Sequence, residues 1–362
     1  MIKKTGYQIV ETDEIKILRS PDYNYNFNKK NGLFMRWGKD IGDDPQFSPF
    51  GPELLDCEIS IGGCSGKCPF CYKNNTDASP INMTFQTFKQ ILDKMPNTLT
   101  QIAFGITNIQ ANPDFISMMR YCRTTGIIPN FTLSGIDLTD ELAQECAKLV
   151  GAVAVSCYQK DKNICYDTVK KFTDLGLKQV NIHILLAVET LDFVYEVLND
   201  IRTDARLAGL NAIVFLGVKN KGRAKDYHSV ALPDFQKLIQ HCLNFNYPIG
   251  FDSCSAPKFE KSIKAIAMPD TKKQTMLTLS EPCESALFSF YCNVYGKFSP
   301  CSFNENEKKW EDGGISILET DDFVKDIWYH SRIGEWRETL LKNERMCPTF
   351  DLDYENDNKS KA

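Results

Sequence analysis

The sequence predicts an α/β protein whose main domain is a partial (β/α)6–7, TIM-like barrel. An N-terminal β extension precedes the barrel and a small α+β subdomain follows it. Three observations support this architecture. The chain has 362 residues, of which 43% are hydrophobic, enough for one large domain or two ordinary ones. Between residues 53 and 252, short β-rich runs alternate with amphipathic helical stretches. Strands separated by helices form parallel βαβ units, and six or seven such units indicate a barrel. After residue 252 this alternation stops.

The composition is that of an ordinary soluble globular protein. Lys and Arg total 42 and Asp and Glu total 47, for a net charge of −5. This balance excludes a disordered chain, a coiled coil and an obvious polybasic nucleic-acid binder. No uncharged run reaches the roughly 18 residues that a membrane helix needs, so we expect a cytoplasmic protein with no membrane partner. In a reducing compartment the 14 cysteines are expected to be core thiols or metal ligands.

Residues 1–52 are predicted to form the β extension. Strand-like runs cover residues 15–18, 23–27 and 33–37, and Asn31-Gly32 between the last two is a hairpin signal. Three prolines, Pro45, Pro49 and Pro52, separate this element from the barrel.

The barrel is expected to cover residues 53–252. Its predicted strands are 54–61, 101–105, 128–133, 152–156, 179–186, 212–216 and 249–252, and its predicted helices are 84–94, 115–124, 140–149, 164–175, 191–207 and 233–244. The subdomain spans residues 253–350, with a hairpin over 281–303 around Tyr295-Gly296 and helices over 321–330 and 335–341. The charged tail, 351–362, has no periodicity and is predicted to be disordered.

Three cysteines, Cys64, Cys68 and Cys71, follow the first barrel strand in a glycine-rich loop with Cys-x3-Cys-x2-Cys spacing. Chance would produce this spacing only ~0.02 times in such a chain. Thiolate is the usual ligand of a [4Fe-4S] cluster, and three cysteines hold three iron corners while the fourth stays open. Glycines let the loop fold around the cluster.

This motif, including the aromatic Phe70 before the third cysteine, resembles that of the radical S-adenosylmethionine (radical SAM) superfamily. The resemblance implies that SAM binds the open iron and that one electron cleaves it to methionine and a 5′-deoxyadenosyl radical, which abstracts a substrate hydrogen. The alternative, a zinc loop, is disfavoured because the triplet lacks paired Cys-x2-Cys spacing and a nearby histidine.

The resemblance also implies SAM contacts at strand ends. Gly105, Ile106, Thr107 and Asn108 stand where the superfamily has Gly-Gly-Glu-Pro, with Thr107 in place of the glutamate. Ser134 and Ser156 resemble positions that contact the SAM carboxylate or ribose, although capping a following helix is an equally good interpretation. For His183, a hydrogen-bonded residue of the barrel interior is a better interpretation than a catalytic residue. Lys219 and Arg223 lie in a segment that resembles the adenine-side loop, where a solvated basic loop is slightly favoured.

A second group of cysteines lies towards the C-terminus: Cys254, Cys283, Cys292, Cys301 and Cys347. Cys283 and Cys301 frame Gly296, where a hairpin turn needs a positive φ. The remaining cysteines, Cys57, Cys122, Cys146, Cys157, Cys165 and Cys242, fall in strands and helices and read as ordinary thiols.

The second group resembles the SPASM or twitch extensions of radical SAM enzymes, which bind auxiliary [4Fe-4S] clusters. The dense cysteine segment of a full SPASM domain is absent, so the resemblance implies one twitch-like cluster. The preferred ligands are Cys254, Cys283, Cys301 and Cys347, with Cys292 as the competing fourth ligand. A zinc site and free thiols are the alternatives.

The expected function is therefore radical SAM chemistry, with SAM and two [4Fe-4S] clusters as cofactors and an electron donor such as flavodoxin or ferredoxin as partner. Four protein ligands leave no open iron, so the auxiliary cluster is expected to relay an electron. A peptide is the leading substrate class by association with relatives, and a nucleotide or small metabolite is the alternative. The rival of another class is a non-catalytic zinc or iron-sulfur scaffold. No catalytic side chain is assigned.

Overall fold

The barrel is built on one large, mainly parallel sheet. The computed structural model describes residues 6–76 and 78–352. Within these residues the sheet has the strand order β13-β12-β11-β10-β9-β8-β5-β14-β15-β16, and its two ends do not pair with each other. The predicted partial barrel is therefore confirmed. The strands are β5 (Leu54–Glu58), β8 (Gln101–Gly105), β9 (Ile128–Leu133), β10 (Val153–Ser156), β11 (Val180–Leu186), β12 (Ala212–Gly217), β13 (Ile249–Phe251), β14 (Ser289–Cys292), β15 (Lys297–Ser299) and β16 (Ile315–Ser316).

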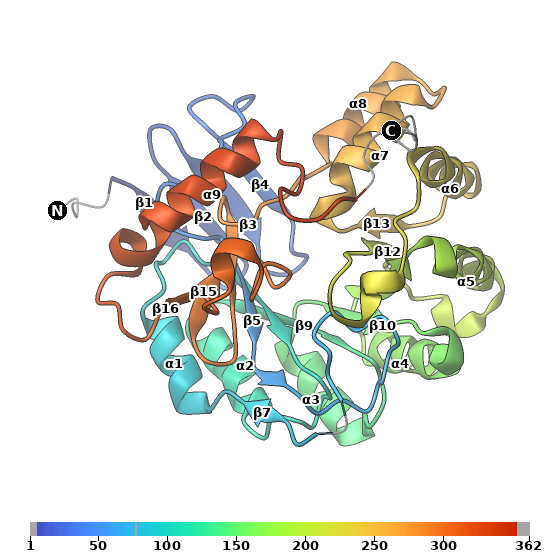
Figure 1. Ribbon diagram of the computed structural model, residues 1–362, viewed down its shortest axis with the longest axis horizontal. Helices are drawn as coiled ribbons and strands as arrows, with labels where there is room; N and C mark the ends of the chain where they lie inside the picture. Colours follow the sequence, from blue (N-terminus) through green and yellow to red (C-terminus); the bar gives the residue numbers. More distant parts are fainter. Residues whose placement is uncertain (1–5, 77, 353–362) are drawn as a thin grey trace.

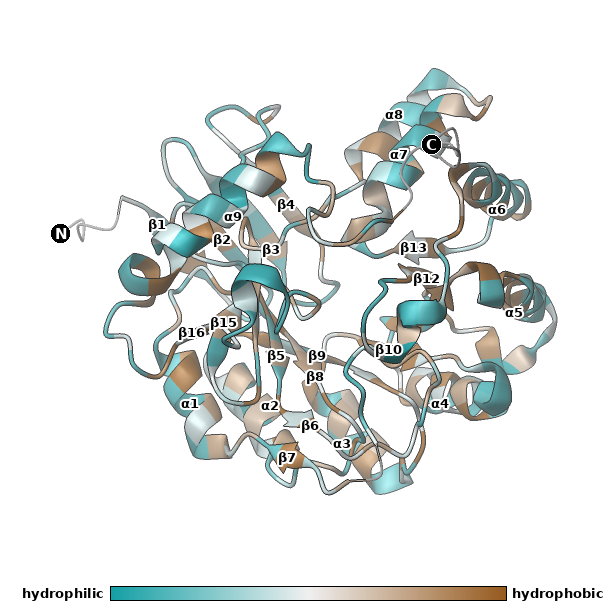
Figure 2. Ribbon diagram, in the orientation of Figure 1, coloured by the Kyte–Doolittle hydropathy of each residue, from teal (hydrophilic) through white to brown (hydrophobic). Residues whose placement is uncertain are grey.

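Helices cover the outside of the sheet, with their apolar faces towards it (Figures 1 and 2). The barrel helices are α1 (Phe85–Asp93), α2 (Phe115–Thr124), α3 (Asp140–Leu149), α4 (Lys162–Asp174), α5 (Leu191–Thr203) and α6 (Leu232–Phe245). Helix α1 begins where the Thr84 hydroxyl accepts a hydrogen bond from the Thr87 amide, at 3.1 Å, and it buries Phe88 and Ile91. The helices thus seal one face of each strand from water.

The opposite face of each strand lines the barrel lumen, and this face is less buried. In β5, Leu55 and Cys57 are buried against the helices, whereas Asp56 between them is half-buried. In β11 the same alternation leaves His183 half-buried between two buried isoleucines. Side chains alternate across a strand, so the half-buried positions face the interior. In β5 and β11 the half-buried side chains therefore lie on the interior face of the sheet.

A four-stranded antiparallel sheet lies beside the barrel. It consists of β1 (Gln8–Glu11), β2 (Ile15–Arg19), β3 (Asn24–Asn28) and β4 (Phe34–Trp37), and it packs under helix α9 (Ser331–Lys342) (Figure 1). Strands β2 to β4 match the predicted runs, and β1 was not predicted because its side chains are mostly exposed. Arg36 of β4 fixes the sheet to the barrel through ion pairs with Glu53 (2.7 Å) and Glu281 (2.9 Å).

Several predicted elements differ from the structure. The expected strand 54–61 breaks at Ile59, and β6 (Ser60–Ile61) pairs instead with β7 (Ile81–Asn82). The expected helix 191–207 ends at Thr203. The region 321–330 contains a π-helix, Phe323–Trp328. Helices α7 (Ala256–Ala265) and α8 (Asp270–Thr278) were not predicted.

Two expectations about the whole chain remain. Most of the tail expected to be disordered, 351–362, lies outside the described residues, but Leu352 is described and is buried. Among the described residues, no helix combines the length and the apolar composition that crossing a membrane would require.

Candidate functional site

The first cysteine group lies in a tightly constrained loop after β6. The Cys68 thiol is hydrogen-bonded to Cys71, and this bond lowers the pKa of Cys71 well below its ordinary value while raising that of Cys68. The charge of Cys64 also raises the pKa of Cys68, so all three thiols are close neighbours. Gly63 has no room for a side chain, because a Cβ would lie 2.2 Å from the Ala78 carbonyl oxygen. The loop therefore needs glycine where the chain crosses itself.

Arg223 holds this loop from the far side of the barrel. Its guanidinium donates to the Cys68 carbonyl at 3.0 and 3.2 Å and to the Asn75 carbonyl at 2.8 Å. At Gly222, with φ of 59°, a Cβ would meet the Cys71 and Tyr72 carbonyl oxygens at 2.6 Å. The interpretation of Arg223 as part of a solvated loop was therefore wrong. Its acceptors are backbone carbonyls, which leave no trace in a residue pattern.

The expected SAM-contact segment lies against the same loop. Residues 105–108 follow β8, and the Thr107 carbonyl accepts from Cys64 Sγ at 3.6 Å. The Asn108 Oδ1 accepts from both the amide and the hydroxyl of Ser65, at 3.1 and 2.8 Å. Gly105 is exposed at the strand end, while Ile106 packs partly against the core. The segment is thus placed at the cysteine loop, with the Asn108 side chain used to hold that loop.

The other expected SAM contacts surround the loop less closely. Phe70 packs against Tyr158 and Tyr227, with both ring centroids 5.7 Å away. The Ser134 hydroxyl accepts from the Ile136 amide at 3.3 Å, which is a local turn contact. Ser156 ends β10 and is hydrogen-bonded to Tyr158.

The C-terminal cysteines come from four separate segments and meet in one place. Burial raises the pKa of Cys254 well above its ordinary value, and the charges of Cys283 and Cys347 raise it further. Burial raises the pKa of Cys283 to about 12, with further contributions from Cys301 and Cys347. The mutual electrostatic effects place Cys254, Cys283, Cys301 and Cys347 in the same neighbourhood of the fold. Cys292 points the other way and is hydrogen-bonded to Cys57 in the core.

Donors already point at two of these sulfurs. Asn304 Nδ2 donates to Cys301 Sγ at 3.1 Å, and the Phe350 amide donates to Cys347 Sγ at 3.4 Å. Such hydrogen bonds to sulfur are a normal feature of iron-sulfur ligands. Across residues 6–76 and 78–352, no three His, Cys, Asp or Glu side chains are close enough to hold a single metal ion. The ligand atoms of the cysteine loop and of the four C-terminal cysteines are thiol sulfurs, which are the usual ligands of an iron-sulfur cluster.

A buried charge network joins the cysteine loop to the C-terminal hairpin. Lys73 Nζ lies 2.9 Å from Glu58 and 2.6 Å from Glu305. Tyr291 of β14 donates to Glu58 at 2.6 Å, and Asn293 donates to Glu305 at 2.7 Å. Sequence reasoning missed this network, although Lys73 stands only two residues after Cys71. It fixes the first thiol group relative to the segment that carries Cys301.

A second buried pair lies at the barrel mouth beside Cys254. Lys219 is almost fully buried, forms an ion pair with Asp252 and lies 4.8 Å from the centre of the Phe303 ring. The interpretation of Lys219 as a solvated side chain was therefore also wrong. Burial lowers the pKa of His183 to about 4, although Asp252 opposes this shift, so the imidazole is neutral.

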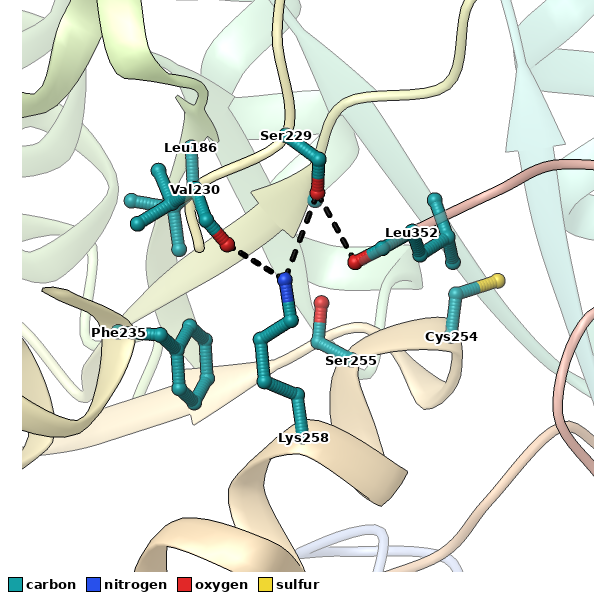
Figure 3. Close-up of a pocket in the computed structure, with 9 residues that line it drawn as sticks. Leu186, Ser229, Val230, Phe235, Cys254, Ser255, Lys258 and Leu352 are labelled. Carbon is teal, nitrogen blue, oxygen red and sulfur yellow. Dashed lines mark hydrogen bonds between the residues drawn. The ribbon is translucent and has the colours of Figure 1, made fainter. Parts of the chain in front are cut away.

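The last described residues close over this mouth. Phe350 packs on Phe303, and the Leu352 carbonyl accepts from Ser229 at 3.0 Å. Figure 3 shows Leu352 and Cys254 on one side of a small pocket, with Phe235 and Val230 on the other. Lys258 enters this pocket from α7 and donates to the Val230 carbonyl at 2.5 Å.

No protein-family model matches the chain, and no curated protein sequence is significantly similar to it. Solved structures do match. The crystal structure of Streptococcus suis SuiB bound to precursor peptide SuiA aligns with a TM-score of 0.65 and 12% identity, over 91% of this chain and 90% of SuiB. SuiB bound to S-adenosylmethionine aligns with a TM-score of 0.60 and 14% identity, over 80% of this chain and 68% of that one.

A second protein with the same fold is anSMEcpe. Its structure with bound AdoMet (S-adenosylmethionine) and Cp18Cys peptide aligns with a TM-score of 0.58 and 13% identity, over 78% of this chain and 82% of that one. At such identities the similarity establishes the fold. The chain therefore has the fold of the SAM-binding proteins SuiB and anSMEcpe, in agreement with the radical SAM resemblance of its sequence.

Proposed function

We propose that this protein is a radical SAM enzyme that modifies a peptide. Cys64, Cys68 and Cys71 would hold the catalytic [4Fe-4S] cluster, and SAM would bind beside residues 105–108, Ser134, Ser156 and Phe70. When bound, the cluster and SAM supply one-electron cleavage to methionine and a 5′-deoxyadenosyl radical, which abstracts a substrate hydrogen. The observation that carries the proposal is the three-thiol loop at the strand end of a barrel with the SuiB fold.

The chain's own residues hold this site in place. Arg223 and Lys160 donate to backbone carbonyls of the cysteine loop, with Lys160 Nζ 3.0 Å from the Gly66 oxygen. These bonds place positive charge beside thiolates that carry negative charge, which favours the deprotonated ligands a cluster needs.

Cys254, Cys283, Cys301 and Cys347 would hold an auxiliary [4Fe-4S] cluster that accepts an electron from the substrate radical. With a flavodoxin or ferredoxin as donor, one electron would be needed for SAM cleavage. Oxidation of the substrate radical would release one electron and one proton, and the auxiliary group held by these four thiols would supply an acceptor for that electron. A peptide substrate is supported by the fold, since SuiB and anSMEcpe have both been solved with bound peptides.

Anaerobic reconstitution tests the proposal. We expect about eight irons per chain and dithionite-dependent release of 5′-deoxyadenosine from SAM. Cys71→Ala should lose about half of the iron and all SAM cleavage, whereas the matched control Cys146→Ala, a buried thiol of α3, should keep both. Zinc in place of iron, or no SAM cleavage by the wild-type protein, would support the scaffold alternative instead.

A further inference from the structure

The last described residues, 348–352, lie across the mouth of the barrel. We call this segment the strap; it belongs to no helix or strand. Leu352 shares a small pocket with Leu186 and Gly217, the last residues of β11 and β12. Cys254, which follows β13, lies in the same pocket (Figure 3). In barrels of this kind the reaction takes place at the carboxyl ends of the strands. The strap therefore covers a place that a substrate must reach.

Two side chains of the strap face the protein. Exposure alternates along its end, where Phe350 is half-buried, Asp351 is exposed and Leu352 is 4% exposed. The Phe350 ring packs on Phe303, with ring centroids 6.3 Å apart. With Leu352 in place, the cavity that remains beside it measures ≈ 10 Å³, room for about one water molecule. The mouth thus accepts an aromatic side chain and, two residues later, an aliphatic one.

Donors below the strap bind the carbonyl groups of its backbone. Lys308 Nζ donates to the Pro348 carbonyl at 3.2 Å and to the Thr349 carbonyl at 3.4 Å. The Ser229 hydroxyl donates to the Leu352 carbonyl at 3.0 Å. Every residue of every peptide carries a carbonyl, so these donors suit another chain equally well. Backbone hydrogen bonds for affinity and side-chain pockets for selectivity are the usual division of peptide recognition.

The strap is weakly held compared with the barrel. Leu352 is its only buried residue, and both hydrogen bonds from Lys308 are exposed to solvent. Segments with few buried contacts and exposed hydrogen bonds open at a low free energy. The strap can therefore leave the mouth while the barrel stays folded.

We propose that the groove beneath the strap, formed by Phe303, Lys308, Ser229 and Val230, binds the substrate peptide, and that the strap occupies this groove as an internal competitor. This inference rests on the proposed function, because it states where the peptide of that function binds. The preferred ligand is an extended segment with an aromatic residue followed two positions later by a leucine. When the strap leaves, the same contacts hold the substrate in its place.

Fluorescence anisotropy tests the groove with the anaerobically reconstituted full-length protein. The probe is fluorescein-labelled Pro-Thr-Phe-Asp-Leu amide, which has the sequence of the strap. Wild-type protein should bind the probe weakly, because its own strap competes. Leu352→Asp should release the strap and bind the probe about tenfold more tightly or better. The matched control Leu279→Asp changes a leucine that is 76% exposed and should behave like wild type.

Two further substitutions test the contacts themselves. A probe with serine in place of its phenylalanine, or aspartate in place of its leucine, should bind much more weakly. In the Leu352→Asp protein, adding Ser229→Ala should weaken probe binding about two- to tenfold, because the donor to the last carbonyl is lost. Equal probe binding by wild type and Leu352→Asp would overturn the proposal, and so would equal binding of the probe and its substituted forms.

Hydrogen exchange of the wild-type protein gives a readout that needs no variant. Excess unlabelled peptide should raise the exchange of residues 348–352, because it displaces the strap. Peptide binding that leaves this exchange unchanged would place the peptide elsewhere and overturn the proposal.

SAM cleavage measured in the same samples separates the two hypotheses. A protein that exchanges its strap for the peptide but does not cleave SAM would refute the proposed function and leave the groove intact. A protein that cleaves SAM but keeps its strap in place under excess peptide would refute the groove alone.

Discussion

Replacing Asp56 by asparagine should stabilise the protein, and the gain should depend on pH. Burial raises the pKa of Asp56 from 3.8 to about 6. Because the folded pKa lies above the unfolded one, the unfolded chain releases its proton first as the pH rises. The free energy of unfolding therefore falls between about pH 4 and pH 6. Above pH 6 the ionised Asp56 carboxylate destabilises the folded protein by its full amount.

The size of the effect follows from the shift. A shift of about two pKa units corresponds to at most about 3 kcal/mol of unfolding free energy lost when Asp56 is ionised. Asp56 is half-buried, and solvent screening reduces this to about 1–2 kcal/mol. For a chain of 362 residues the gain corresponds to roughly 1–3 °C in the thermal midpoint.

Differential scanning fluorimetry of wild type and Asp56→Asn, reconstituted anaerobically, measures this at pH 8 and pH 5. We expect the variant to be more stable at pH 8 and to keep about half of that advantage at pH 5, midway through the titration. Asp44→Asn controls for the lost net charge. A variant that is less stable than wild type at pH 8, or equally stabilised at both pH values, would refute the reasoning. A stabilising loss of a polar group is the usual signature of a residue kept for function.

Three further predictions follow from the same geometry. Cys283→Ala should lose about four irons while Cys292→Ala keeps them, as measured by iron analysis, because only Cys283 lies among the other C-terminal thiols. Lys73→Met should destabilise the protein by about 3–5 kcal/mol, because it leaves Glu58 buried without a cation; adding Glu58→Gln should recover part of the loss in thermal unfolding. The ring signals of His183 should not titrate between about pH 5.5 and pH 8 in NMR spectra, because its pKa is lowered to about 4; a midpoint near 6.5 would contradict its burial.

Local patterns allowed most of the barrel to be predicted. Seven strands and six helices alternate with the expected periods, and Cys64, Cys68 and Cys71 are close in sequence, so one loop carries all three. Helices α7 and α8 escaped prediction. Helix α8 buries none of its side chains, so no apolar stripe marks it in the sequence.

Contacts between residues far apart in the sequence were harder to predict. The partner of Lys219 is Asp252, directly after the neighbouring strand β13, and Arg223 binds carbonyl groups that every residue carries. The position of Cys292 depends on the alternation of a four-residue strand, which the sequence left open. The half-buried Asp56 was missed as well, although an acidic residue between buried Leu55 and Cys57 was a detectable signal.

The pairing of β14 with β5 has a consequence for how the protein matures. Strand β5 leads into the loop of the first three cysteines, and Leu55 on it lies beside Phe290, from the opposite end of the chain. Contacts between such distant residues form late and slowly during folding. Until they form, Lys73 lacks Tyr291 and Glu305, and the thiols of the chain are open to oxidation. If the proposed clusters are bound, productive delivery of iron would wait for nearly complete folding, and oxygen during synthesis should do more damage than oxygen afterwards.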